Sequence, residues 1–256
     1  MNYKIELKIC LMLLFVLFVF VSNTHAIDNC FSSSNLVSWW AFENNTNDIK
    51  GLNNAELVSN VGYSNGIIGS GIQLQNGGIV EINDSQSLQL QRFTVSAWVR
   101  PDGPGPNDDA FGSVIVLKAL PYSGTYLPIS LFWSNSTKQF TFVFGSIYTD
   151  KIVSRPIFTS GKFYHVAATY DGSTFKLYVN GKLESAQNEV VSISYDATQP
   201  WNIGSSHLYA RNMGYPRTWN GVIDEVNIHD RALSQDEINS IIAQTMLQDR
   251  SAQTCN

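Results

Sequence analysis

The stretch FYHVAATYDGSTFKLYVNGKL, residues Phe163–Leu183, determines the predicted fold class. Apolar and polar residues alternate along Phe163–Tyr170 and Phe175–Val179, as they do in half-buried strands. Asn180-Gly181 then separates the second run from KLESA. Asn-Gly between alternating runs is the strongest short-range signal for a β-hairpin, because both turn residues must tolerate positive φ. The three runs therefore predict an antiparallel meander.

Similar short alternating runs occur on both sides of this stretch. Ser234 and Glu237 form a capping box ahead of a single convincing helix, expected over Gln235–Met246. Many short strands with one terminal helix indicate an all-β fold, specifically a two-sheet antiparallel jelly-roll sandwich with one short C-terminal helix. The other expected strands are Leu36–Phe42, Phe93–Val99, Ser113–Lys118, Pro128–Trp133, Gln139–Phe144, Lys182–Ala186 and Val222–Ile228.

The N-terminus has the pattern of a secretory signal peptide. Lys4 and Lys8 precede an apolar run, Ile9–Val21, which is too short for a bilayer-spanning helix, and small residues follow at Thr24 and Ala26. We expect residues 1–26 to be removed and residues 27–256 to form a single secreted domain. An uncleaved membrane anchor is the alternative.

Charge and cysteine content narrow the class of partner. The chain carries a net charge of −5 without a Lys/Arg cluster, which argues against nucleic acid as a partner, and no second apolar run predicts a membrane span. After signal removal, Cys30 and Cys255 remain at the two ends. In an oxidising compartment they predict a disulfide; two free thiols are the alternative. Sequons at Asn44, Asn83 and Asn135 mark candidate glycosylation sites.

Catalytic motifs are weak. GYSNG, Gly62–Gly66, matches the nucleophile elbow by letters only, because a second Gly-containing, strand-like run follows it where a helix is required; we interpret it as a surface turn. His165 alternates within a strand and is expected to be structural. Asp224 and Glu225 are adjacent, so in a regular strand they would point to opposite faces and could not act together on one glycoside.

Four segments, in this order, resemble laminin-G-like domains of the concanavalin A-like lectin/glucanase superfamily, over about Leu36–Ile242. They are LVSWWAFENNTNDIKGLNNAEL, FTVSAWVRP, FYHVAATYDGSTFKLYVNGKL and WNGVIDEVNIHDRALSQDEI. The resemblance implies neighbouring termini and a structural Ca²⁺ site at Asp48, Asn53 and Asp224, residue types that suit the oxygen-rich coordination of Ca²⁺. Alternatively, Asp224 accepts backbone hydrogen bonds from the first loop without a metal.

The expected function is therefore a secreted, non-catalytic binding module for a glycan or an extracellular protein. A polysaccharide hydrolase or lyase of the same superfamily, or a purely structural or adhesive surface protein, are the alternatives. Aromatic and polar residues gather in the loop Ser205–Thr218, where they could contact sugar rings and hydroxyls, or where the tyrosines could pack beneath the loop. The candidate ligand contacts are His207, Tyr209, Arg211, Tyr215 and Arg217.

Overall fold

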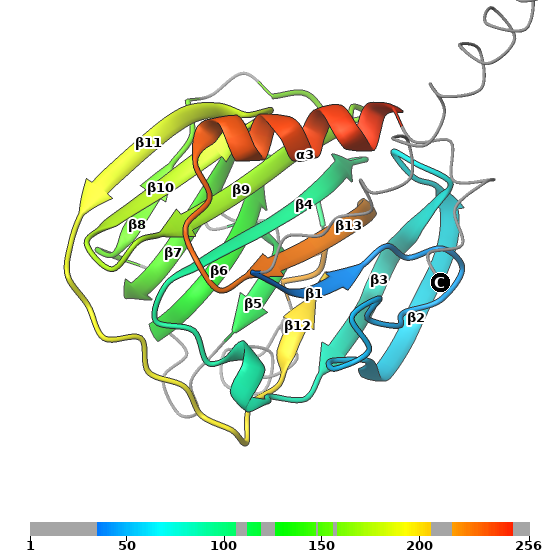
Figure 1. Ribbon diagram of the computed structural model, residues 1–256. Helices are drawn as coiled ribbons and strands as arrows, with labels where there is room; N and C mark the ends of the chain where they lie inside the picture. The colour runs from blue at the N-terminus through cyan, green and yellow to red at the C-terminus, as the bar shows by residue number, and fades with distance from the viewer. Residues whose placement is uncertain are drawn as a thin grey trace, which may run out of the picture. The chain divides into compact units, whose positions relative to one another are not determined.

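The computed structural model describes residues 35–105, 112–118, 126–146, 148–155, 158–205 and 217–247 (Figure 1). Within these residues the chain forms thirteen strands, a 3₁₀ turn η1 and the helix α3. Their bounds are β1 Leu36–Trp40, β2 Ala55–Asn65, β3 Ser70–Ile82, η1 Gln86–Leu88, β4 Phe93–Pro101, β5 Ser113–Lys118, β6 Tyr126–Ser134, β7 Gln139–Ser146, β8 Lys151–Val153, β9 Tyr164–Tyr170, β10 Thr174–Val179, β11 Lys182–Asn188, β12 Trp201–Ile203, β13 Gly221–His229 and α3 Gln235–Leu247.

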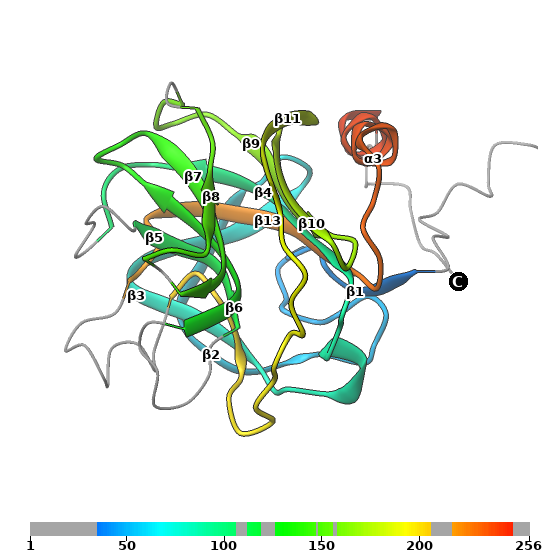
Figure 2. The ribbon, with the colours of Figure 1, turned by 90° about the vertical axis from the view of Figure 1, so that its left-hand side faces the viewer.

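All described strand pairs are antiparallel, and they join into one continuous sheet in the order β11-β10-β9-β4-β13-β3-β12-β5-β6-β7-β8. β1 is added on β13, and β2 on β3. The short strand β12 pairs with both β3 and β5, so it connects the two halves of the sheet. Figure 2 shows β7 and β8 facing β9 and β10, with α3 on the outer side of that second layer. The all-β jelly-roll prediction is confirmed.

Aromatic side chains from both layers fill the space between them. Phe144 of β7 stacks on Phe175 of β10 with ring centroids 3.9 Å apart, and Tyr170 of β9 stacks on the other side of the same ring at 3.9 Å. Trp201 and Trp219 are almost fully buried in the same cluster. Each such ring contributes on the order of 2–3 kcal/mol of hydrophobic free energy, so this cluster holds the layers together.

The local signals in the sequence have their expected structures. Asn180 and Gly181 both have positive φ, 49° and 75°, and connect β10 to β11 as a tight hairpin. At the start of α3 the Glu237 carboxylate accepts the Ser234 N–H at 2.8 Å, while the Ser234 hydroxyl accepts the Glu237 N–H at 3.3 Å. The side chains of Ile238 and Ile241 are buried on the inner side of α3. None of the described helices is long and apolar enough to cross a membrane.

One segment differs from the prediction. The stretch expected to be a surface turn, GYSNG, lies mostly in β2, with its turn confined to the residues after Asn65. Among the described strands β2 pairs only with β3, and it exposes residues on both faces, including Glu56, Leu57 and Val58. Its sequence therefore lacks the alternation of a half-buried strand. The strands β8 and β12 were not predicted because three residues are too few to show an alternating pattern.

Candidate functional site

Two acidic side chains from distant parts of the chain hold the turn between β2 and β3. Asp224 of β13 accepts the backbone N–H groups of Ile67 and Ile68 with Oδ2, at 2.9 and 3.4 Å. Glu43, which follows β1, accepts the N–H of Ser70 at 3.0 Å. The turn between residues 66 and 70, together with these carboxylates, is called the carboxylate turn below. Because the donors are backbone groups, the turn requires acidic partners but few specific side chains of its own.

The two glycines of the carboxylate turn let the acidic groups approach. A Cβ at Gly66 would overlap Asp224 Oδ2 and would lie 2.9 Å from the Ile68 carbonyl oxygen. Gly69 has φ 52°, and a Cβ there would overlap the carboxylate of Glu43. The spacing Gly66-x-x-Gly69 is therefore the sequence signal that could have located this site. Neither the turn nor Glu43 was among the predicted site residues.

A bulge in β13 changes the expected relation between Asp224 and Glu225. Glu225 has φ 53°, and the pairing of β13 with β4 shifts register between Asp224 and Asn227. β13 is therefore not a regular strand here, and the alternation that would place the two carboxylates on opposite faces does not apply to them. Asp224 Oδ1 accepts the N–H of Glu225 at 2.8 Å, and Glu225 Oε2 accepts the indole N–H of Trp39 at 2.8 Å.

The two carboxylates also interact electrostatically. Asp224 and Glu225 are 0% and 2% exposed. Burial, and after it the neighbouring charge of Glu225, raise the pKa of Asp224, and the backbone N–H groups of Ile68, Ile67 and Glu225 oppose the rise, so that the pKa lies at about 8. The pair is thus enclosed within the protein and bonded to its own chain, an arrangement that stabilises a turn rather than one that meets a substrate.

Asp48 organises a second loop. Its Oδ1 accepts the N–H groups of Trp39 and Lys50, each at 2.9 Å, and its Oδ2 accepts those of Leu52 and Asn53, at 3.3 and 3.0 Å. Four donors fill the acceptor positions of a carboxylate. The Asn53 side chain bonds the hydroxyls of three serines, which are Ser38, Ser85 and Ser87.

These contacts bear on the predicted Ca²⁺ ligands. Asp48 and Asn53 belong to one hydrogen-bond network and Asp224 to the carboxylate turn, and Trp39 connects them by donating its backbone N–H to Asp48 and its indole N–H to Glu225. Within the described ranges, no group of three or more His, Cys, Asp or Glu is placed to hold a metal ion. As placed, Asp48 does not fit a cation ligand, whereas Glu43 and Asp224 reach the same turn and offer two carboxylates.

The other predicted residues are only partly described. Arg217 is buried, 3% exposed, and donates from Nη1 to the carbonyl oxygen of Gly112 at 3.3 Å, so it packs inside the protein. His207, Tyr209, Arg211 and Tyr215 lie outside the described residues, as do Cys30, Cys255 and the predicted signal peptide.

The three sequons differ in their surroundings. Asn44 and Asn83 are exposed and lie outside the strands. Asn135 is half-buried, and its Oδ1 accepts hydrogen bonds from Lys138 Nζ at 2.6 Å and Ser160 Oγ at 3.2 Å. Glycosylation stays a prediction at all three, with Asn44 and Asn83 the more accessible.

Several solved structures share this architecture. Domain 4 of AbnA, a GH43 extracellular arabinanase from Geobacillus stearothermophilus, in complex with arabinotriose, aligns with a TM-score of 0.64 at 18% identity, over 81% of this chain and 98% of that one. The binding domain of Paraclostridial Mosquitocidal Protein 1 aligns with a TM-score of 0.62 at 18% identity, over 82% of this chain and 52% of that chain. Trypanosoma rangeli sialidase aligns at 0.61 and 19% identity, over 84% of this chain but 33% of the sialidase.

At these identities the similarity establishes the fold alone. No curated protein is significantly similar in sequence to the chain. A family model described as the concanavalin A-like lectin/glucanases superfamily matches residues 74–239, from the middle of β3 into α3. That segment is more than half of the chain, and it includes the meander β9–β11 and the bulged strand β13. The chain therefore belongs to the concanavalin A-like lectin/glucanases superfamily.

Proposed function

We propose that the protein is a secreted, non-catalytic module that binds a glycan. The observation that carries the proposal is the enclosure of Asp224 and Glu225, the adjacent acidic pair of β13. Glycoside hydrolysis requires two carboxyl groups on either side of the scissile bond, in contact with the sugar. Asp224 and Glu225 are instead buried and engaged with the turn after β2 and with Trp39.

The share of each solved structure that aligns with this chain supports the proposal. The chain aligns with nearly all of domain 4 of the arabinanase, which was solved with arabinotriose, but with only a third of the sialidase. This extent agrees with the proposal that the chain acts as a single binding domain. Because one fold carries many functions, the identity of the ligand must be inferred from the residues of the site and not from the fold.

A binding screen combined with a product assay tests the proposal. The purified protein is applied to an array of oligosaccharides with Ca²⁺ and with EDTA, and the bound oligosaccharides are then incubated with it and analysed by chromatography. We expect binding without any cleaved or unsaturated product. Cleavage that is lost in Asp224→Asn would instead establish the hydrolase or lyase alternative. If the protein binds no glycan but binds an extracellular protein, the ligand is instead an extracellular protein. N-terminal sequencing of the exported protein tests secretion and removal of residues 1–26.

A further inference from the structure

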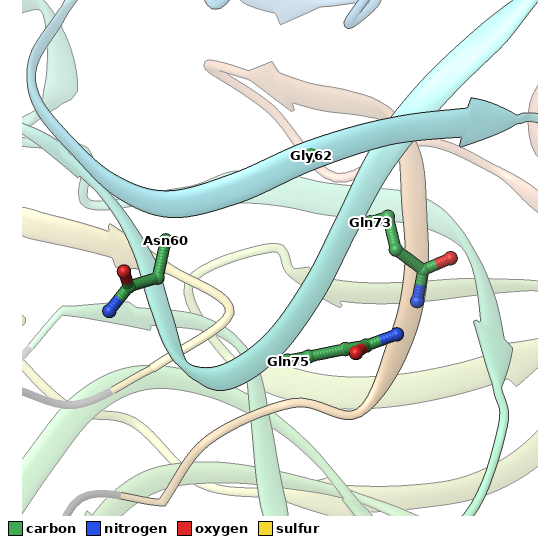
Figure 3. A pocket seen from close by; sticks show the side chains of 4 residues that line it. All are labelled: Asn60, Gly62, Gln73 and Gln75. Atoms are coloured by element: carbon green, nitrogen blue, oxygen red, sulfur yellow. The ribbon is translucent and has the colours of Figure 1, made fainter.

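A polar pocket of about 350 Å³ lies on β2 and β3, near the carboxylate turn but distinct from it (Figure 3). Its lining residues are Asn60, Gly62, Gln73 and Gln75. Figure 3 shows the amides of Gln73 and Gln75 extending toward one another, with Asn60 on the other side of the pocket. Three carboxamides and a glycine therefore line a hollow on an edge of the sheet, and no charged residue is among them.

An irregularity of the β2–β3 pairing creates the rim of the pocket. Ser59 pairs with Ile79, but Val61 pairs with Leu74, so residues 75–78 of β3 oppose Asn60 alone. Asn60 has φ 52°, a conformation that an asparagine tolerates better than most residues. Bulges of this kind re-aim side chains and occur often beside binding sites. Here the bulge places Asn60 and Gln75, both exposed, at the two sides of the hollow.

The amide of Gln73 is held in place before any ligand arrives. Its Oε1 accepts the hydroxyl of Ser64 at 3.1 Å, and its Nε2 donates to the carbonyl oxygen of Gly221 at 3.2 Å. Each of these atoms retains a further hydrogen-bonding position, since an amide oxygen accepts two bonds and an amide nitrogen donates two. A fixed amide reduces the entropy that a ligand must offset on binding.

Gly62 is the second observation that points to a ligand. It lies inside β2, where glycine weakens a strand, yet it does not have a positive φ. A Cβ placed there would meet nothing nearer than Gln73 at 3.9 Å, which is ordinary van der Waals contact. Neither backbone conformation nor packing therefore requires a glycine at this position. A residue without a side chain does, however, keep the floor of the pocket open to a group that approaches the strand closely.

We propose that this amide pocket is a binding subsite for a neutral glycan, an inference that rests on the proposed glycan-binding function. Carboxamides offer donors and acceptors together, as sugar hydroxyls do. An acidic sugar would need a cation, but Arg100, which lies across Val222 from Gln73 in the sheet, is paired with Asp102 through two contacts of 2.8 and 3.0 Å. The pocket thus selects uncharged over sialylated or sulfated saccharides.

The test compares two pocket variants with a matched control. The wild-type protein is first screened on an array of neutral arabino-, xylo-, gluco- and galacto-oligosaccharides and of sialylated glycans. The strongest neutral oligosaccharide is then titrated calorimetrically into the wild type, Gly62→Leu, Gln75→Ala and Ala186→Leu. Ala186 is an exposed small residue of β11, a terminal strand that four strands separate from β3 in the sheet, so the control adds similar bulk away from the pocket. Melting temperatures show whether each variant is folded.

We expect Gly62→Leu to reduce affinity at least thirtyfold by filling the pocket, and Gln75→Ala to reduce it about tenfold, while Ala186→Leu leaves it unchanged. Wild-type binding that both pocket variants retain would overturn the amide pocket while leaving the proposed function intact. Binding to sialylated glycans alone would overturn the neutral class. Absence of any glycan binding by the wild type would overturn the proposed function and this subsite together. If Gly62→Leu alone fails to fold, Gln75→Ala still decides, because its exposed amide makes no hydrogen bond to the described residues.

Discussion

Lys118 Nζ lies 2.6 Å from Asp84 Oδ1, and both side chains are completely buried. The ammonium group also donates to the carbonyl oxygens of Asp196, at 3.1 Å, and Gln199. Three acceptors thus satisfy its three donors. The ion pair connects the end of β5 to the segment after β3 and to the segment before β12. Burial lowers the pKa of Lys118, and the adjacent carboxylate of Asp84 opposes this.

Removal of the cation alone should be costly. In Lys118→Met the Asp84 carboxylate stays buried without its partner, and we expect a loss of about 3–5 kcal/mol in the free energy of unfolding. Asp84→Asn in the same background should restore part of that loss, because it removes the uncompensated charge. Urea unfolding of the two single variants and the double variant measures the coupling. A loss below about 1 kcal/mol in Lys118→Met would show that the pair is not buried in solution.

Acid should destabilise the fold through two buried histidines. Burial lowers the pKa of His165 to about 3 and that of His229 to about 4; the positive charge of Arg231 contributes to the latter. The unfolded state binds these protons near pH 6.5 whereas the folded state does not, so stability falls as the pH drops below 6.5 toward 3–4.

The expected loss is on the order of 1 kcal/mol per pH unit for each histidine, between about pH 6 and pH 4. His165 packs edge-on against Trp98, with ring centroids 5.4 Å apart, so His165→Phe keeps a ring there and removes the titration. Urea unfolding at a series of pH values should give a shallower slope in this variant than in the wild type. Equal slopes would mean that His165 is protonated in the folded protein.

Calcium binding stays a prediction, and Glu43 is added to its candidate residues because its carboxylate reaches the same turn as that of Asp224. We expect millimolar Ca²⁺ to raise the melting temperature by roughly 5–10 °C if it is present at a hundredfold excess over its Kd. Asp224→Asn and Glu43→Gln should remove the shift, because both carboxylates hold the same turn. Asp48→Asn should lower the baseline stability but keep the shift, since its oxygens serve backbone N–H groups. Identical melting in Ca²⁺ and EDTA would leave these residues with hydrogen bonding only.

The capping box of α3 can be tested with two serines of the same helix region. Ser234→Ala removes the hydroxyl that accepts the Glu237 N–H and should cost about 1 kcal/mol. Ser240 lies on the exposed side of α3, and its hydroxyl donates to the carbonyl oxygen of Asp236, so Ser240→Ala should be neutral or slightly stabilising. Thermal unfolding followed by circular dichroism gives both values. Equal effects of the two substitutions would contradict the capping role.

The sequence predicted those features whose signals are local. The meander around Asn180-Gly181 and the Ser234–Glu237 cap depend on residues within a few positions of one another, so turn and helix chemistry could be recognised directly. The carboxylate turn depends on contacts across 27 and 157 positions, from Glu43 to Ser70 and from Asp224 to Ile67. Such contacts follow from strand order, and the nearby spacing Gly66-x-x-Gly69 does not indicate which distant carboxylates reach the turn.

The central place of β13 in the sheet has a consequence for synthesis of the chain. β13 lies between β4 and β3 and also carries β1, although it is the last of the described strands to leave the ribosome. β4 ends at residue 101 and β13 begins at residue 221, so at about 5–20 residues per second the nascent chain waits roughly 6–24 s for it. During that interval β3 and β4 each present an open edge, the feature that recruits stray strands from other chains. The two edges therefore stay open to aggregation until β13 has been synthesised, and a chaperone would have to shield them.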